Sequence, residues 1–356
     1  MKNSIDKWSL KKKIVFSFLP LFLLIAAGEL TCRVFYYQLK SNSVFALTEA
    51  YEYLSYKIKL KVSDIINRDY RLKSKGVWEA LFSEKGRELR FEFQKEYEKH
   101  FSLLVSSANE IQTKLIVLYI PSAKPNSKIA VSEKICQAFY KSLAKKYQVT
   151  YFDLTLSLRR YEWEAVTLLP KNGHLSRFGN RIIAKELNDY LKPLLDYRSG
   201  VEVNHEISIY GDLKPSNIEL KLNPMYMPYQ EITNKQGFRN MNDLSEKLKQ
   251  RILILGDSIT YGPYLPNHDT YPSLMEQFNA KIEVINAGKS GYTITDEVSL
   301  FIEKARYISP DITILQVLDN DIYGLFYFKK NQFDRKKRVY DPTPLEKKFL
   351  NELEES

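Results

Sequence analysis

The stretch Arg251-Ile-Leu-Ile-Leu-Gly-Asp-Ser-Ile-Thr-Tyr-Gly262 decides the fold of this chain. Its first five residues are mostly apolar, and the run stops at Gly256. A short apolar run of this kind predicts a strand that is buried on both faces, as in a parallel sheet. Ligands of open parallel sheets bind beyond the carboxyl ends of the strands, where Ser258 is expected to lie. Gly-Asp-Ser is also ordinary turn chemistry, so these three residues alone do not establish a site.

Apolar runs and helical patterns alternate along the rest of the chain. The predicted strands are residues 115–121, 149–154, 251–255, 282–286 and 312–317. The predicted helices are residues 84–110, 131–146, 178–194, 271–279 and 296–307. Alternation of strands and helices predicts a parallel sheet with crossover helices, and therefore the α/β class.

Two further motifs follow predicted strands, Ile285-Asn-Ala-Gly-Lys-Ser-Gly-Tyr-Thr293 and Ile314-Leu-Gln-Val-Leu-Asp-Asn-Asp321. With Gly-Asp-Ser they resemble the first three sequence blocks of the SGNH/GDSL hydrolases, a family of serine esterases and acyl-transfer enzymes. The resemblance implies a three-layer α/β/α sandwich with a five-stranded parallel sheet, and Ser258 as the nucleophile. It also implies an oxyanion hole formed by the Ser258 N–H, the Gly291 N–H and the Asn320 side-chain amide. The chain departs from the family pattern at Leu318, where glycine is usual.

The order of the blocks differs from that of the family. The family's catalytic histidine follows its fifth strand, whereas no histidine follows residue 268 here. Instead, Lys171-Asn-Gly-His-Leu-Ser-Arg-Phe-Gly-Asn180, encoded before the serine, resembles the histidine block. We therefore predict a circularly permuted domain, with strands four and five encoded first, which surface termini would permit. Two half-domains, each completed by another chain, are the alternative.

His174 is the predicted general base of this arrangement, and a plain surface histidine in a loop is the competing interpretation. Asn172 stands where the family has the aspartate that orients the base. Asparagine can hold an imidazole, but it cannot stabilise imidazolium by charge. In one serine protease the Asp→Asn change costs roughly 10⁴ in turnover. Nearby carboxylates that could replace the acid are Asp153, Glu162 and Glu164.

The N-terminus predicts export. Lys11-Lys-Lys13 precedes fifteen uncharged residues, 14–28, somewhat short of the roughly 20 that a membrane span needs. A cleaved signal peptide and an uncleaved signal anchor are both compatible with this pattern. We favour the anchor, because aromatic and arginine residues continue beyond Glu29 as they do at membrane interfaces. The lysines place the N-terminus in the cytoplasm, which predicts a single-pass membrane protein with its main domain extracytoplasmic.

The predicted organisation has four parts. Residues 1–40 form a cytoplasmic tail and anchor, and 44–195 hold strands four and five with the histidine block. Residues 196–250 form an irregular linker or covering extension, and 251–356 hold the serine, glycine and Asn-Asp blocks. The net charge of +10 comes without a nucleic-acid-binding motif, so no nucleic-acid partner is expected. Two cysteines and four scattered histidines lack metal-ligand spacing, so neither a metal nor a cofactor is expected. The oligomeric state is left open.

These observations predict a membrane-anchored, extracytoplasmic serine esterase that acts on O-acyl esters, O-acetyl esters foremost. Its substrate would be a small ester or an O-acylated glycan. An O-acyltransferase of cell-surface glycans is the first alternative. A catalytically impaired relative that binds or assembles glycans is the second, and it is motivated by Asn172. The third is an incomplete chain that needs a partner.

Overall fold

The computed structural model describes residues 81–84, 86–121, 130–168, 173–195, 210–221, 228–244, 247, 249–322 and 324–325. The predicted cytoplasmic tail and anchor, residues 1–40, lie outside these ranges. Within the described ranges, no helix combines the length and the apolar character that a membrane crossing requires.

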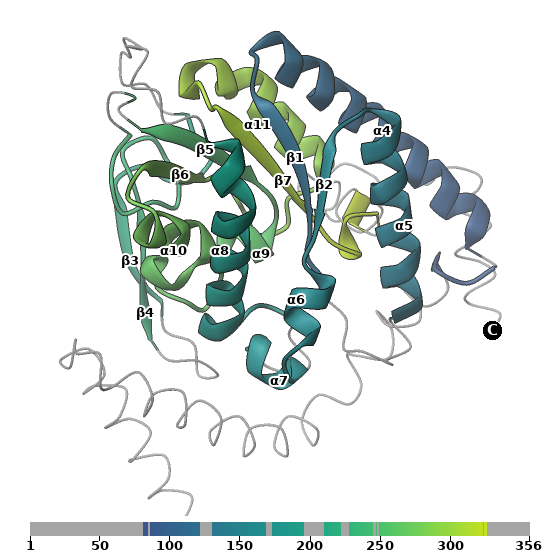
Figure 1. The fold of residues 1–356 in the computed structure, drawn as a ribbon, viewed down its shortest axis with the longest axis horizontal. Coiled ribbons are helices and arrows are strands. Elements are labelled where there is room, and N and C mark those ends of the chain that lie inside the picture. Colours follow the sequence, from purple (N-terminus) through teal and green to yellow (C-terminus); the bar gives the residue numbers. More distant parts are fainter. Residues whose placement is uncertain are drawn as a thin grey trace, which may run out of the picture. The chain divides into compact units, whose positions relative to one another are not determined.

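Five parallel strands form one sheet (Figure 1). They are β1 (Lys114–Tyr119), β2 (Thr150–Asp153), β5 (Gln250–Leu255), β6 (Ile282–Asn286) and β7 (Ile312–Val317), and their spatial order is β2-β1-β7-β5-β6. Strand β1 pairs with β7 along its whole length, from Lys114 beside Ile312 to Tyr119 beside Val317. Strands from the two halves of the chain therefore belong to the same sheet.

Helices cover both faces of the sheet. One face carries α4 (Arg87–Glu110), α5 (Ala130–Lys146) and α11 (Ile294–Ile308), and the other carries α6 (Thr155–Arg159), α7 (Trp163–Val166), α8 (Arg177–Leu191) and α10 (Tyr271–Phe278). Alternate strand residues enter the two cores: Val117 packs with the first set of helices, and Ile116 and Leu118 with the second. Burial on both faces explains why the strands are apolar throughout. The predicted five-stranded parallel sheet between helical layers is confirmed.

The connections locate the place where a ligand would bind. From β5 the chain crosses to β6 through α10 on one face, and from β6 it returns to β7 through α11 on the other. The first crossover leads away from β5, and the second leads back past β5 in the opposite direction. Strands β5 and β7 therefore lie side by side, and the crossover helices connected to them lie on opposite faces of the sheet. Such a topological switch point leaves a crevice at the carboxyl ends of the two strands. Gly-Asp-Ser follows β5, and the Asn-Asp block follows β7.

Residues 210–244 contain a feature that the sequence analysis missed. Strands β3 (Asn217–Lys221) and β4 (Tyr229–Thr233) pair as an antiparallel hairpin within the region predicted to be irregular. The side chains of Ile218 and Leu220 on β3 are exposed. The hairpin therefore lacks the buried apolar face that makes a strand recognisable in a sequence.

Candidate active site

Ser258 is the first residue of the short helix α9 (Ser258–Tyr261). The preceding Asp257 caps this helix, because its carboxylate accepts a hydrogen bond of 2.9 Å from the Ile259 N–H. The Ser258 hydroxyl donates to the other carboxylate oxygen over 3.4 Å, which is long for such a bond. Asp257 is buried, whereas Ser258 is only half-buried. The aspartate thus fixes the turn, while the serine stays accessible.

The glycine block, residues 285–293, lies directly against this turn. The Lys289 N–H donates to the Gly256 carbonyl over 3.1 Å. A β-carbon on Gly288 would lie 2.5 Å from the Tyr261 backbone nitrogen, so only glycine permits this approach. Gly291 adopts a φ of 84° and is half-exposed. The segments that follow β5 and β6 therefore pack directly against each other.

The Asn-Asp block closes the other side of the turn. The Asn320 side-chain amide donates to the Asp257 carboxylate over 3.3 Å, and Asn320 is half-exposed. The Asp321 carboxylate accepts from the Leu318 N–H over 3.0 Å and so holds the turn after β7. Leu318, at the position where the family has glycine, is buried in the core that contains α8 and α10. Three strand-end blocks therefore meet at the predicted edge of the sheet.

The histidine loop, residues 173–176, lies beside the chain that follows the serine. Gly173 adopts a φ of 72°, and the His174 carbonyl accepts from the Leu168 N–H over 2.8 Å. The half-buried His174 ring meets the Tyr264 ring edge-to-face, with centroids 5.7 Å apart and planes at 77°. The histidine, encoded 84 positions before Ser258, thus contacts a residue six positions after it.

Helix α8, which begins after the histidine loop, is attached to the same segment. The Arg177 guanidinium pairs with Asp269 at 2.8 Å, and the Asn180 side chain accepts from the Tyr271 N–H over 2.9 Å. Both contacts are made by buried side chains of α8, Arg177 and Asn180. They fix the histidine loop against the chain that follows α9.

Asn172 and nearby carboxylates are the groups predicted to orient the imidazole. Asn172 lies outside the described residues. The Asp153 carboxylate accepts from the Gln137 amide at 2.6 Å, the Tyr151 hydroxyl at 3.2 Å and the Thr155 N–H at 2.8 Å. These donors tie Asp153 to the turn between β2 and α6. Glu162 is exposed at the start of α7.

A buried arginine that the sequence analysis did not single out supports the site. We call residues 262–270 the post-serine loop. The fully buried Arg239 guanidinium donates to the carbonyls of Tyr261, Gly262 and Leu265, which binds the end of α9 to this loop. Asn234-Lys-Gln-Gly-Phe-Arg-Asn240 resembles a stretch that precedes the serine block in membrane-anchored SGNH members. That resemblance is the sequence signal that could have drawn attention to Arg239.

Tyr264 has an unusual backbone in this loop. Its φ is 71°, which places a non-glycine residue in the left-handed region. The cost of that conformation for an L-residue is about 1–2 kcal/mol. Backbone outliers of this kind persist where surrounding contacts impose them, and they are common at functional sites. The Tyr229 side chain hydrogen-bonds the Tyr264 backbone and contributes to that constraint.

Three buried carboxyls lie beneath the site. Burial raises the pKa of Glu297, and the nearby charges of Asp321 and Asp257 raise it further. Burial likewise raises the pKa of Asp321, with a further contribution from Asp257. Burial also raises the pKa of Asp257, although hydrogen bonds from Ile259 and Asn320 act in the opposite direction. In the part of the chain that the structure describes, no group of acidic, His and Cys side chains is arranged to hold a metal ion.

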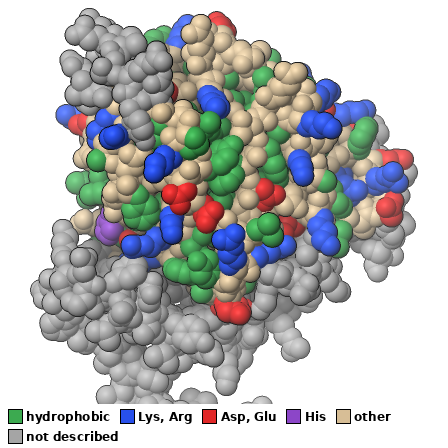
Figure 2. All heavy atoms as spheres, viewed as in Figure 1, with side chains coloured by type: hydrophobic (Ala, Val, Ile, Leu, Met, Phe, Trp, Pro, Cys, Tyr) green, Lys and Arg blue, Asp and Glu red, His purple; other side chains and the backbone are tan. Residues whose placement is uncertain are grey.

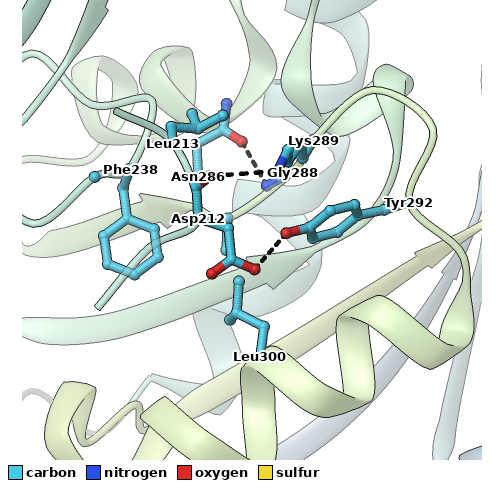
Figure 3. Close-up of a pocket in the computed structure, with 10 residues that line it drawn as sticks. Asp212, Leu213, Phe238, Asn286, Gly288, Lys289, Tyr292 and Leu300 are labelled. Carbon is cyan, nitrogen blue, oxygen red and sulfur yellow. Dashed lines mark hydrogen bonds between the residues drawn. The ribbon is translucent and has the colours of Figure 1, made fainter. Parts of the chain in front are cut away.

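A small hollow lies beside the glycine block (Figure 3). Asp212, Phe238, Gly288 and Tyr292 contribute to its walls. Asp212 accepts a hydrogen bond from the Tyr292 hydroxyl and pairs with Lys304, which secures residues 210–213 over α11. The hollow has room for little more than one water molecule, so it is too small for a substrate.

The surface around these elements carries mixed charge. In the face seen in Figure 2, Lys and Arg side chains are scattered with Asp and Glu between them. Attraction of a polyanion needs a concentration of one sign of charge. That face offers none.

The fold and the strand-end residues together define an α/β protein with a candidate ligand crevice at the switch point of its sheet. No family model and no curated protein matches the sequence. Solved structures with a loosely similar fold include the following two. The O-acetyltransferase domain of Pseudomonas putida AlgJ has a TM-score of 0.44 and 10% identity, over 65% of this chain and 84% of that chain. Pseudomonas aeruginosa AlgX has a TM-score of 0.37 and 17% identity, over 66% of this chain and 59% of that chain.

Proposed function

We propose that this chain is a serine acyl-transfer enzyme of the SGNH type that cleaves O-acyl esters, O-acetyl esters foremost. The observation that carries the proposal is the convergence of three strand-end blocks around the serine turn. The glycine block binds that turn through the Lys289 N–H, and Asn320 binds it through the Asp257 carboxylate. The histidine loop packs on the same segment through Tyr264.

In the proposed reaction the Ser258 hydroxyl attacks the acyl carbonyl, and His174 accepts the hydroxyl proton. The negative charge on the carbonyl oxygen is stabilised by the Ser258 N–H, the Gly291 N–H and the Asn320 amide. One such donor is typically worth about 3 kcal/mol of barrier. The alcohol leaves with the proton from His174, and water then releases the acid from the acyl-serine by the same steps. Asn172 would hold the imidazole without contributing charge.

The same proposal includes a permuted family fold. In the spatial order β6-β5-β7-β1-β2, the strand followed by the serine stands second and the strand followed by the histidine loop stands fifth. A family member read from the serine strand would place its strands in this order, with the histidine after the last. Helix α4 precedes β1 and covers the same face as α5 and α11. In an unpermuted family member, the crossover from the strand that corresponds to β7 to the one that corresponds to β1 would lie on this face.

The acceptor and the location are also proposed. Attachment to the membrane through residues 14–28 would hold the domain outside the cytoplasm, near O-acylated glycans. If an alcohol of a glycan replaces water in the second step, the same residues catalyse O-acyl transfer. Exclusion of water from the acyl-serine would select that outcome.

Labelling with a fluorophosphonate, which modifies activated serines, tests the proposal directly. We expect wild-type protein to be labelled at Ser258 and to hydrolyse a short aryl ester, and Ser258→Ala to lose both properties. Ser299→Ala is the matched control, because Ser299 is exposed on α11 and its hydroxyl bonds the Thr295 carbonyl of its own helix. Products analysed by mass spectrometry with and without a glycan acceptor separate hydrolysis from transfer. A folded wild-type protein that neither labels nor hydrolyses would sink the proposal and favour a non-catalytic glycan-binding role.

A further inference from the structure

The proposed catalytic set consists of the nucleophile, the base and the oxyanion donors, and Tyr264 is not part of it. The Tyr264 ring nevertheless contacts the His174 ring. We propose that Tyr264 is a positioning residue, whose ring holds the His174 imidazole in the orientation needed to take the proton from Ser258. This inference rests on the proposed function. It assigns a role to an aromatic side chain that comes from the serine half of the chain.

The first support is geometric. The two rings meet edge-to-face, with 5.7 Å between centroids and 77° between planes. Aromatic pairs prefer this arrangement. A ring packed in this way restricts rotation of the imidazole. Both side chains are half-buried, so the pair lies at the accessible edge of the site.

The second support is the way in which the loop presents Tyr264. Arg239 binds the carbonyls on both sides of it, at Gly262 and Leu265. The Asn267 side chain bonds the Ile232 backbone in both directions, at 2.7 and 3.0 Å. These contacts fix the loop backbone on both sides of Tyr264, and with it the position from which its ring reaches His174.

The third support comes from the sequence of the histidine block. The family's aspartate both orients the imidazole and stabilises its positive charge. Asn172 stands at that position here and carries no charge. Rigid packing of the imidazole by a neighbouring ring compensates for part of the lost orientation, since catalysis depends on the alignment of the reacting groups.

Two substitutions separate the ring from the backbone. Tyr264→Phe keeps the ring and removes the hydroxyl. Tyr264→Asn removes the ring, and asparagine tolerates the left-handed conformation better than most residues, so the loop keeps its backbone. We expect kcat for a short aryl ester to stay within about threefold of wild type in the Phe variant. In the Asn variant we expect kcat to fall about 10- to 100-fold with little change in KM, since misplacement by about 1 Å can cost this much.

Tyr161→Leu is the matched control. Tyr161 is exposed, and it makes a similar edge-to-face pair with Phe178, at 5.0 Å and 88°. We expect its kcat to stay near that of wild type. The inference is overturned if the Asn variant keeps wild-type kcat, or if the Phe variant loses as much as the Asn variant. A wild-type protein that is inactive and unlabelled by the fluorophosphonate overturns the proposed function instead, which distinguishes the two failures.

Discussion

At the scale of single residues, the carboxyl edge of the sheet separates accessible groups from buried ones. Ser258, Gly291 and Asn320 are half-exposed, whereas Asp257 and Asp321 are buried and hold the turns that carry them. The accessible residues could be predicted from the sequence, because each stands in a motif at the end of an apolar run. Whether they act as proposed stays a prediction.

The first residue-scale prediction concerns the close approach at Gly288. In Gly288→Ala the new β-carbon would lie 2.5 Å from the Tyr261 nitrogen and 2.7 Å from the Thr260 β-carbon. Overpacking of this kind typically costs about 1–3 kcal/mol. We expect the free energy of unfolding, measured by urea denaturation, to fall by that amount. Ser290→Ala is the control, because Ser290 is exposed in the same loop, and it should change stability by less than about 0.5 kcal/mol.

The second residue-scale prediction concerns pH. Burial and the charges of Asp321 and Asp257 raise the pKa of Glu297 above its ordinary value, so the folded protein binds this proton more tightly than the unfolded chain does. The contribution of Glu297 to stability is therefore full below the unfolded pKa of about 4.3, and it is lost as the pH rises toward the folded pKa. Glu297→Gln removes this loss, so it should stabilise the protein more at pH 8 than at pH 5.

Thermal unfolding at the two pH values measures that difference. Glu303→Gln is the control, because Glu303 is exposed on the same helix and its replacement should have nearly the same small effect at both pH values. An equal effect of Glu297→Gln at pH 5 and pH 8 would contradict the prediction.

At the scale of elements, the strands and long helices could be predicted from apolar periodicity. The predicted strand 312–317 coincides with β7, and the predicted helix 131–146 matches α5 to one residue. Periodicity cannot reveal the post-serine loop, because Arg239 acts on carbonyls that are 22 to 26 positions away and no local pattern marks them. The same holds for Tyr264, whose contact with His174 exists only after folding.

The element-scale prediction tests the hydrogen bonds that Arg239 donates to the end of α9 and the post-serine loop. Arg239→Met keeps much of the volume of the side chain but leaves three backbone carbonyls without their donor. A buried polar group that loses its partner costs about 1–3 kcal/mol, so we expect a total loss above about 3 kcal/mol. Lys235→Met is the control: Lys235 stands four positions before Arg239 and forms an exposed ion pair with Asp243, so its replacement should cost less than about 1 kcal/mol. Urea denaturation measures the free energy of unfolding of both variants. A similar decrease in the two variants would contradict the prediction.

At the scale of the whole molecule, the sheet joins two halves of the chain through β1 and β7. This union could be predicted because the strand count before residue 195 and after residue 251 was incomplete in each half. Asn172 is the residue that the sequence predicts to hold His174, and it lies outside the described residues. The contribution of Tyr264 could not be predicted, because it depends on which side chains lie near the imidazole and not on their order in the chain. Tyr264 is one such neighbour of the His174 ring.

The whole-molecule prediction uses this union. A chain cut between Leu195 and Tyr210 should yield two fragments that fold only together, since β1 and β7 pair along six residues. Co-expression followed by size-exclusion chromatography should recover both fragments in one complex with cooperative unfolding. Each fragment expressed alone should be insoluble or unfolded. Two separately folded, soluble fragments would contradict a single domain and support the alternative of two half-domains.

The β1–β7 union also has a consequence for biosynthesis. Thr113 and Thr313, 200 positions apart, share a buried hydrogen bond of 3.0 Å at the start of these strands. A ribosome makes β1 long before β7, so one apolar edge of the growing sheet has no neighbour until almost 200 further residues have been made. The nascent chain must be kept from aggregating during that interval, and a premature stop codon before β7 would remove the strand at the centre of the sheet.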